Sequence, residues 1–216
     1  MATLKCVIFD MDGTLVDSEA VHDEGFRQVF KKYHLDVTDE QILSWHGTGV
    51  PGLIKNIIRI VGDESFAIKL LDESIVYLED ELLAGRFYTF KGAKALLQFC
   101  KDQGLIVGLA TSSLGEWGKL VVSKTGIEGY FDFMLFGDDV INMKPAPDIY
   151  HLAIERAGVN REECLVFEDS LVGVEAAHKA GLRVVQICHG QQSDLTQEHI
   201  SSLDEAKAIV KKALGS

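Results

Sequence analysis

The stretch from Cys6 to Leu15 constrains the fold of this 216-residue chain more than any other. An unbroken apolar run there ends abruptly in Asp10-Met11-Asp12-Gly13. A continuous run, rather than an alternating one, is typical of a strand that helices cover on both faces in a parallel sheet. Such sheets bind ligands at the carboxyl ends of their strands. We therefore expect a buried strand that carries two acidic side chains to the ligand-binding edge of an α/β fold.

The two acids, Asp10 and Asp12, are two residues apart, so in extended backbone they project to the same side. Gly13 then allows a tight turn. Two carboxylates in one small volume repel each other unless a cation or a shared proton relieves them, which favours a hard divalent metal with oxygen ligands. The alternative is that Asp-Gly is an ordinary turn signal, and this stretch alone does not separate the two interpretations.

Composition excludes several classes of function. A formal net charge of -12 argues against general binding to nucleic acid or to anionic membranes, because both would repel the chain. No secretory signal and no apolar run long enough to span a bilayer occurs, so we expect a cytoplasmic protein. Reduced core thiols are expected for the four widely spaced cysteines, Cys6, Cys100, Cys164 and Cys188.

Four further apolar runs predict buried strands, at Leu105–Ala110, Phe133–Phe136, Leu165–Phe167 and Val184–Ile187. Helical patterns lie between them, and this alternation indicates an α/β fold with a parallel sheet. Residues 17–89 lack the rhythm and show helical spacing instead. We therefore expect an α/β core made of residues 1–16 and 90–216 and an inserted helical module at 17–89.

Two of these runs end in polar or acidic residues that could form part of a binding site. The second strand runs into Thr111-Ser112-Ser113, whose hydroxyls and amides could hold an anion. The fourth ends in Glu168-Asp169. Each signal also has a plain structural explanation, since Ser and Thr cap helices and acids are favoured at helix N-termini.

Lys144 stands directly before Pro145, which biases its backbone toward an extended conformation. It is either a fixed cation that neutralises Asp10 and a bound phosphoryl group or a solvated surface lysine. Three apolar strands that end in Asp-x-Asp, Thr-Ser and Glu-Asp, together with this lysine in one chain, favour a functional site over the separate structural explanations.

Taken together and in order, these motifs resemble the four signatures of the haloacid dehalogenase superfamily over essentially the whole chain. The helical insertion resembles the small cap of its β-phosphoglucomutase-like subgroup. The resemblance implies a Rossmann-like, doubly wound parallel sheet in the order 5-4-1-2-3, with an inserted all-helical cap. That order sets Asp10, Thr111 and Asp169 side by side.

The resemblance also implies catalytic roles. Asp10 is the nucleophile that forms an aspartyl-phosphate, and Asp12 protonates the leaving oxygen and later activates water. Thr111 and the amide of Ser112 hold phosphoryl oxygens, and Lys144 balances the charge.

A Mg²⁺ cofactor is implied in the same way. The resemblance places it on Asp10, the backbone carbonyl of Asp12 and Asp169, with Glu168 as a further ligand or a partner behind the ligands.

The subgroup contains phosphatases and mutases, and a mutase needs cationic cap side chains for a second phosphate. Val50 stands about where the sugar-phosphate mutases carry an arginine, and Asp72-Glu73-Ser74 where they carry a lysine. We therefore expect a Mg²⁺-dependent phosphatase for small phosphorylated metabolites, above all sugar phosphates. Lys55 and Arg59 could substitute, so a mutase is the alternative, and a non-catalytic sugar-phosphate sensor is a third.

Cap residues complete the expectation. His22 matches the cap-hinge histidine of those mutases, which would couple cap closure to Asp12, although a histidine packed at a domain boundary fits equally well. Trp45, His46 and Gly47 suggest a loop that contacts substrate, whereas Trp117 is expected to pack in the core. The expected partner is a small phosphorylated metabolite bound by a monomer, with no nucleic acid and no membrane.

Overall fold

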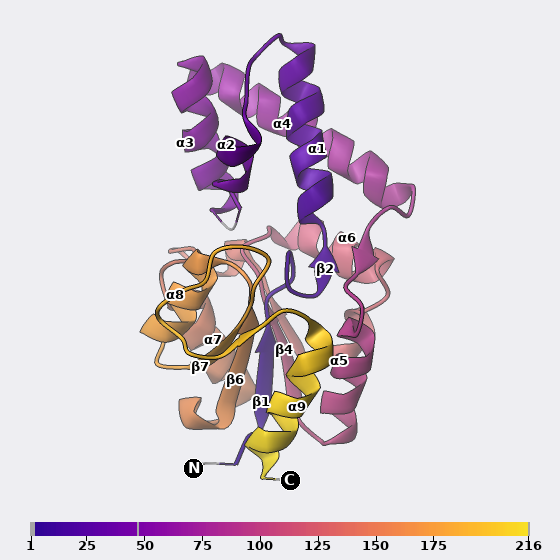
Figure 1. The fold of residues 1–216 in the computed structure, drawn as a ribbon, viewed down its shortest axis with the longest axis vertical. Helices are drawn as coiled ribbons and strands as arrows, with labels where there is room; N and C mark the ends of the chain where they lie inside the picture. The colour runs from indigo at the N-terminus through magenta and orange to yellow at the C-terminus, as the bar shows by residue number, and fades with distance from the viewer. Residues whose placement is uncertain (1–2, 47, 216) are drawn as a thin grey trace.

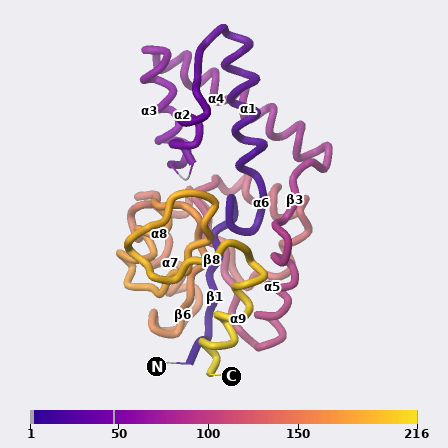
Figure 2. Tube along the Cα trace, viewed as in Figure 1, coloured from indigo at the N-terminus to yellow at the C-terminus, as the bar shows by residue number. Residues whose placement is uncertain are grey.

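The computed structural model describes residues 3–46 and 48–215. A sheet with helices on both faces forms one part of the molecule, and a group of helices stands over one end of that sheet (Figure 1). The tube view shows that both ends of the chain lie at the opposite end of the sheet from these helices (Figure 2).

Within the described residues, six parallel strands form the main sheet, in the spatial order β5-β4-β1-β6-β7-β8. The first five in the chain take the predicted order 5-4-1-2-3, and the sixth adds a short edge. Two-residue β8 was missed because so short a segment carries no readable period. The strand bounds are β1 Cys6–Phe9, β4 Ile106–Ala110, β5 Phe133–Leu135, β6 Cys164–Glu168, β7 Arg183–Ile187 and β8 His199–Ile200.

Helices cover both faces of this sheet, which explains the unbroken apolar runs. In β1 the side chains of Val7 and Phe9 enter one core cluster, and those of Cys6 and Ile8 enter the other. All four are fully buried, and burial of one such large apolar side chain contributes about 1.5–3 kcal/mol. The first face is covered by α5 Ala93–Asp102, α6 Gly115–Lys124 and α9 Leu203–Leu214, the second by α7 Asp148–Ala157 and α8 Leu171–Lys179.

Residues 19–83 form the helices above the sheet, which we call the cap helices. They have a hydrophobic cluster of their own that includes Phe26, Phe30 and Leu70. Trp45 belongs to this cluster, with 4% of its surface exposed and its ring edge-on to Phe26 at 5.1 Å. Trp45 also lines the pocket beneath the cap helices, so its expected contact with substrate stays a prediction. The cap helices are α1 Glu19–Lys32, α2 Asp39–Leu43, α3 Gly49–Val61 and α4 Glu64–Leu83.

The chain leaves the sheet for the cap helices and returns through two segments that lie side by side. Strand β2 (Val16–Asp17) pairs antiparallel with β3 (Tyr88–Thr89). Next to this pair, the amide of Phe90 donates to the carbonyl of Leu15 at 2.9 Å. Both connections thus stand at one narrow junction between cap helices and sheet.

The cysteines carry no disulfide, and three of the four are buried, Cys6, Cys100 and Cys164. Over residues 3–46 and 48–215, no helix is long and apolar enough to cross a membrane.

The loops that follow β4 and β5 touch backbone to backbone at Gly137. A Cβ there would lie 2.5 Å from the carbonyl oxygen of Ser112. Gly137→Ala must displace that loop, so we expect the unfolding free energy to fall by about 1–3 kcal/mol. Gly129→Ala is the matched control, since its Cβ would meet nothing within 4 Å, and should change stability by less than about 0.5 kcal/mol. Urea unfolding measures both, and equal effects would contradict the close approach.

Candidate active site

A pocket, here called the central pocket, lies between the carboxyl edge of the sheet and the cap helices. It brings together the predicted residues that the structure describes, although they come from five separate parts of the chain. Gly47, also predicted to bind substrate, lies outside the described residues. The predicted residues that line the central pocket are Asp10, Asp12, His22, Thr111, Ser112, Lys144, Glu168 and Asp169.

Lys144 is the centre of the pocket floor, not a surface side chain. Only 2% of its side chain is exposed. Its ammonium donates to Asp10 Oδ1 at 2.7 Å, to Glu168 Oε1 at 2.6 Å and to the carbonyl of Ala110 at 3.0 Å. These acceptors lie at the ends of β1, β6 and β4, so one cation joins three neighbouring strand ends. The Lys144–Pro145 peptide bond is cis.

Both oxygens of Glu168 are occupied by donors from this chain. Besides Lys144, Oε1 accepts from the Tyr150 hydroxyl at 3.3 Å. The other oxygen, Oε2, accepts from the amide and hydroxyl of Ser170 at 3.0 and 3.1 Å. A Cβ at Gly173 would overlap the same carboxylate, so only glycine fits there. The carboxylate is thus fixed in one orientation, toward Lys144.

Asp12 is held by two hydroxyl groups from opposite sides of the pocket. Ser18, in the connection to the cap helices, donates to Oδ1 at 2.6 Å, and Ser113, after β4, donates to Oδ2 at 2.6 Å. The carboxylate therefore contacts both the cap connection and the predicted phosphate-binding loop.

Asp169 depends on the tight turn that follows Asp12. Gly13 has a φ of +76°, and a Cβ there would overlap the Asp169 carboxylate. The Thr14 hydroxyl donates to Asp169 Oδ1 at 2.9 Å. Asp169 is also fixed from behind, because the amide group of fully buried Gln186 donates to its carbonyl at 2.9 Å. Glycine at position 13 thus lets the two acidic strand ends approach.

The charges of the pocket floor do not balance. Desolvation raises the pKa of Asp10 well above its usual range, against the opposing attraction of Lys144. Desolvation also raises the pKa of Asp169, and the charges of Glu168 and Asp10 add to that rise. Burial alone would lower the pKa of Lys144, but the two carboxylates it contacts outweigh burial and raise it. Four acidic side chains line the floor and one ammonium opposes them, which favours a further cation.

Oxygen atoms of Asp10, Glu168 and Asp169 lie within 4.8 Å of one another. A set of carboxylate oxygens with excess negative charge matches the ligands that Mg²⁺ prefers. The donor set therefore fits a divalent metal. Because both Glu168 oxygens already accept hydrogen bonds, Asp10 and Asp169 are the better-placed ligands of the three.

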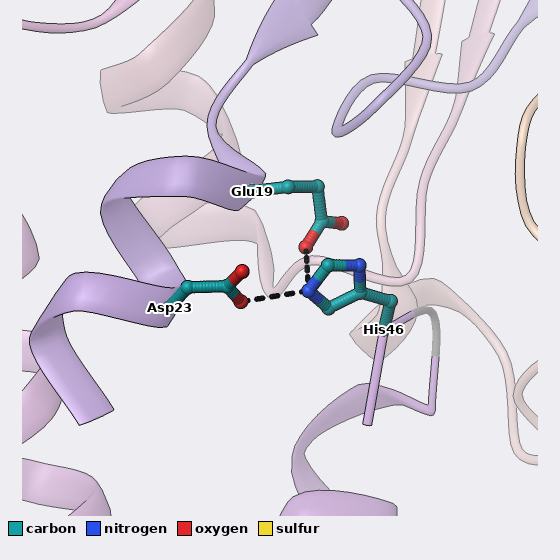
Figure 3. A group of neighbouring side chains, drawn as sticks. All are labelled: Glu19, Asp23 and His46. Atoms are coloured by element: carbon teal, nitrogen blue, oxygen red, sulfur yellow. Dashed lines mark hydrogen bonds and ion pairs between the residues drawn. The ribbon is translucent and has the colours of Figure 1, made fainter. Parts of the chain in front are cut away.

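The central pocket is also lined by a second charged group, made of Glu19, Asp23 and His46. Both carboxylates approach the same ring nitrogen of His46, and the other nitrogen points away from them (Figure 3). Nε2 of His46 is 2.8 Å from Asp23 Oδ1 and 3.1 Å from Glu19 Oε2. Desolvation raises the pKa of Glu19 to about 7, with His46 opposing the rise.

His22 and Trp117 form the side of the pocket nearest the junction. Their rings meet edge-on with centroids 6.4 Å apart, and Trp117 also packs edge-on against Phe87 at 5.8 Å. The expected core packing of Trp117 is thus present, although its side chain lines the pocket as well. Desolvation lowers the pKa of His22 against the attraction of Asp12. Its coupling to Asp12 stays a prediction.

The two cap cations weighed from the sequence lie away from the pocket. Lys55 and Arg59 are both exposed, and Arg59 donates to the neighbouring Asn56 at 3.0 Å. Among the pocket-lining residues that the structure describes, Lys144 is the only lysine or arginine. Sequence reasoning missed Tyr150, Ser18 and Gln186. Only Gln186 gave a signal, as a polar residue inside an apolar run.

The chain is similar in sequence to known phosphatases. A family model described as haloacid dehalogenase-like hydrolase matches residues 7–187. The chain is 34% identical over 213 residues to a Thermotoga maritima protein named phosphorylated carbohydrates phosphatase, a match that covers 96% of this chain and 91% of that protein. It is 28% identical over 181 residues to the fructose-1-phosphate phosphatase YqaB of Escherichia coli, covering 84% and 95%.

Solved structures share the architecture. A β-phosphoglucomutase from Clostridium difficile superposes with a TM-score of 0.81 at 21% identity, covering 98% of this chain and 97% of that one. CbbY from Rhodobacter sphaeroides, in complex with phosphate, gives a TM-score of 0.78 at 24% identity, covering 94% and 96%. At these identities the likeness shows a common fold.

Lys144→Met should be strongly destabilising, because it leaves Asp10 and Glu168 buried without their cation. Removal of one partner of a buried ion pair costs about 3–5 kcal/mol of unfolding free energy. The control is Lys91→Met. The Lys91 side chain is 91% exposed and forms an exposed ion pair with Asp204 at 3.5 Å, so its loss should not change the unfolding free energy measurably. Urea unfolding with chelator present measures both variants. A loss for Lys144→Met no larger than for the control would contradict the buried network.

His46 should titrate above its usual pKa of 6.5. Burial alone would lower this pKa, but the hydrogen bond to Asp23 and the charge of Glu19 outweigh burial and raise it. The ion pair is therefore fully formed below about pH 6.5, and its stabilisation is lost as pH rises through the raised pKa. NMR titration of the imidazole measures the pKa, which Asp23→Asn should lower. Glu24→Gln, one position along the same helix, is the control and should leave the His46 pKa unchanged.

Proposed function

This chain belongs to the haloacid dehalogenase-like hydrolase family, and we propose that it is a Mg²⁺-dependent phosphatase of small phosphorylated metabolites, above all sugar phosphates. One observation carries the proposal. Buried Lys144 fixes Asp10 at the end of β1, in a pocket that also presents Asp12, Thr111 and Asp169. A nucleophile, an acid, anion donors and a cation site therefore face one small volume.

The predicted superfamily and the predicted enzyme class are both confirmed. The chain is a phosphoric monoester hydrolase of this family. Its relatives named as phosphatases of phosphorylated carbohydrates and of fructose 1-phosphate support a sugar phosphate as the substrate.

The proposed reaction has two steps. A carboxylate oxygen of Asp10 attacks phosphorus, the bond to the leaving oxygen breaks, and Asp12 gives that oxygen a proton. In the second step Asp12 takes a proton from water, which attacks the aspartyl-phosphate and releases inorganic phosphate. The hydrogen bonds from Ser18 and Ser113 keep Asp12 at the pocket wall for both proton transfers.

The negative charge of the transferring phosphoryl group would be stabilised by residues that the fold already holds in place. The Lys144 ammonium faces Asp10 and would offset negative charge as the phosphoryl group transfers. Thr111 Oγ1 accepts from the Ser113 amide at 3.1 Å, so its own proton remains to donate to a phosphoryl oxygen. Asp10 and Asp169 would hold Mg²⁺, which when bound shields the phosphate from the carboxylate that attacks it.

Residues 17–89 would act as a cap over this site. The β2–β3 pair is the proposed hinge, since both connections pass through it. Ser18 follows β2 directly and bonds Asp12, so closure of the cap would bear on the proton-transfer group itself. A closed cap would exclude bulk water from the first step.

The cap half of the central pocket favours hydrolysis over the mutase alternative. No lysine or arginine from residues 17–46 or 48–89 lines it, whereas a mutase must hold a second phosphate while its intermediate turns. A non-catalytic sensor is disfavoured, because binding alone does not require a buried lysine that pairs with both Asp10 and Glu168.

Phosphate release from a panel of sugar phosphates, phosphoglycolate and nucleotides tests the proposal, with Mg²⁺ and with chelator. We expect metal-dependent release from one or more sugar phosphates, and Asp10→Asn should lower it at least about a thousandfold because the nucleophile is lost. The control is Asp102→Asn, an exposed aspartate whose side chain accepts a hydrogen bond from Gln98 and from no other side chain in the described part of the chain; it should keep full activity.

Two results would overturn the proposal that this chain is a phosphatase. Conversion of β-glucose 1-phosphate to glucose 6-phosphate without phosphate release would identify the mutase. Binding of sugar phosphates with no turnover of any of them would identify the sensor.

A further inference from the structure

The group formed by Glu19, Asp23 and His46, here called the distal group, lies in the central pocket with the proposed nucleophile. All three side chains line that pocket, as do Asp10 and Lys144. A substrate whose phosphate rests at Lys144 would therefore have its leaving group in the same pocket as the distal group. The distal group does not touch Lys144 or Asp10 through any hydrogen bond or ion pair among the described residues, which leaves it free to contact the alcohol part of the substrate.

The distal group has no cation to spare for a second anion. His46 is the one basic side chain in it, and its Nε2 is already shared by Asp23 at 2.8 Å and Glu19 at 3.1 Å. Arg27 comes no closer than 3.9 Å to Asp23, contacts Asp39 at 2.8 Å and does not line the pocket. Two acidic side chains thus share one imidazole, so the group offers no free positive charge to a second phosphate or to a carboxylate.

The same carboxylates can accept hydrogen bonds from a neutral ligand. A carboxylate has about four lone-pair sites, and each of these two gives one oxygen to His46. The second oxygen of Glu19 has no hydrogen bond among the described residues. Hydroxyl groups of a sugar or polyol are the donors that such acceptors suit.

Much of the remaining pocket wall is apolar. Such a wall suits the face of a sugar ring that presents C–H groups, because no hydroxyl is buried there without a hydrogen bond. Apolar lining residues from the cap helices and α6 include Phe26, Trp45, Leu53, Leu71, Leu78 and Trp117.

We propose that Glu19 and Asp23 are specificity-determining residues, which make the enzyme select monophosphates of neutral polyhydroxy alcohols and reject bisphosphates and carboxylate-bearing esters. This inference rests on the proposed function. Its physical basis is that a second anion would meet acidic side chains whose one cation, His46, is already shared, whereas a neutral hydroxyl can donate to the same acidic side chains.

The test compares kcat/KM for fructose 1-phosphate and fructose 6-phosphate with that for fructose 1,6-bisphosphate, so that the same esters are presented with and without a second phosphate. Phosphoglycolate serves as the carboxylate-bearing ester. We expect the better fructose monophosphate to exceed the bisphosphate and phosphoglycolate by at least about a hundredfold, given the several kcal/mol that a like-charge contact costs.

Charge-neutral variants assign this preference to the distal group. Glu19→Gln and Asp23→Asn keep the side-chain shape, and each should reduce the preference for monophosphate over bisphosphate by about tenfold. Glu24→Gln is the matched control: it lies on the same helix, its side chain is 42% exposed and it does not line the pocket. It should leave the preference unchanged. Thermal unfolding of every variant checks that the comparison is between folded proteins.

Two results would overturn the inference while the phosphatase stands: equal kcat/KM for the monophosphates and the bisphosphate, or a preference that neither Glu19→Gln nor Asp23→Asn changes. Phosphatase activity itself is measured separately with p-nitrophenyl phosphate, whose leaving group carries no sugar hydroxyls. No release of p-nitrophenol would then mean that the proposed function has failed. Calorimetric binding of the same fructose phosphates to Asp10→Asn then tests the inference without turnover. Preference for a monophosphate there would support it, and equal binding or none would overturn it.

Discussion

The site depends on one buried interaction, the contact of the Lys144 ammonium with Asp10, Glu168 and the carbonyl of Ala110. An ion removed from water must find its partners inside the protein, since an unpaired buried charge costs several kcal/mol. The three partners end three neighbouring strands, so the ion pair requires β4, β1 and β6 to finish at one level. The nucleophile is positioned by the same requirement that positions the sheet.

Around that point, small residues decide how closely the strand ends approach. Gly13 admits the Asp169 carboxylate and Gly173 admits that of Glu168. The turn at Gly13 is tied on its far side to the loop after β7, where His189 contacts the Gly13 carbonyl at 2.7 Å and stacks on Phe90. The pocket floor and the junction with the cap helices are therefore linked through one short loop, and movement at either bears on the other.

Sequence patterns predicted the elements whose burial is periodic or continuous. The runs at β1, β4, β5, β6 and β7 were readable because both faces of the sheet are covered, and that leaves no polar side of the strand. The same reasoning does not reach contacts that packing, rather than pattern, decides. Trp45 lines the pocket, as a loop residue above the site would, but its packing against Phe26 and Phe30 has no signal in the sequence. Gln186 interrupts an apolar run because it satisfies buried backbone groups.

The sequence by itself determined the floor of the site. Asp10, Asp12, Thr111 and Asp169 each stand at or just after a recognisable strand end, and parallel strands bring such ends to one edge. Lys144 was recognisable from the proline that follows it. Tertiary structure alone decided the second charged group of the pocket. Glu19 and Asp23 share one face of α1 by helical spacing, but their meeting with His46 depends on how the segment between α2 and α3 packs against that helix. Such contacts across elements have no period in the chain, so only the folded packing fixes which charges the substrate meets.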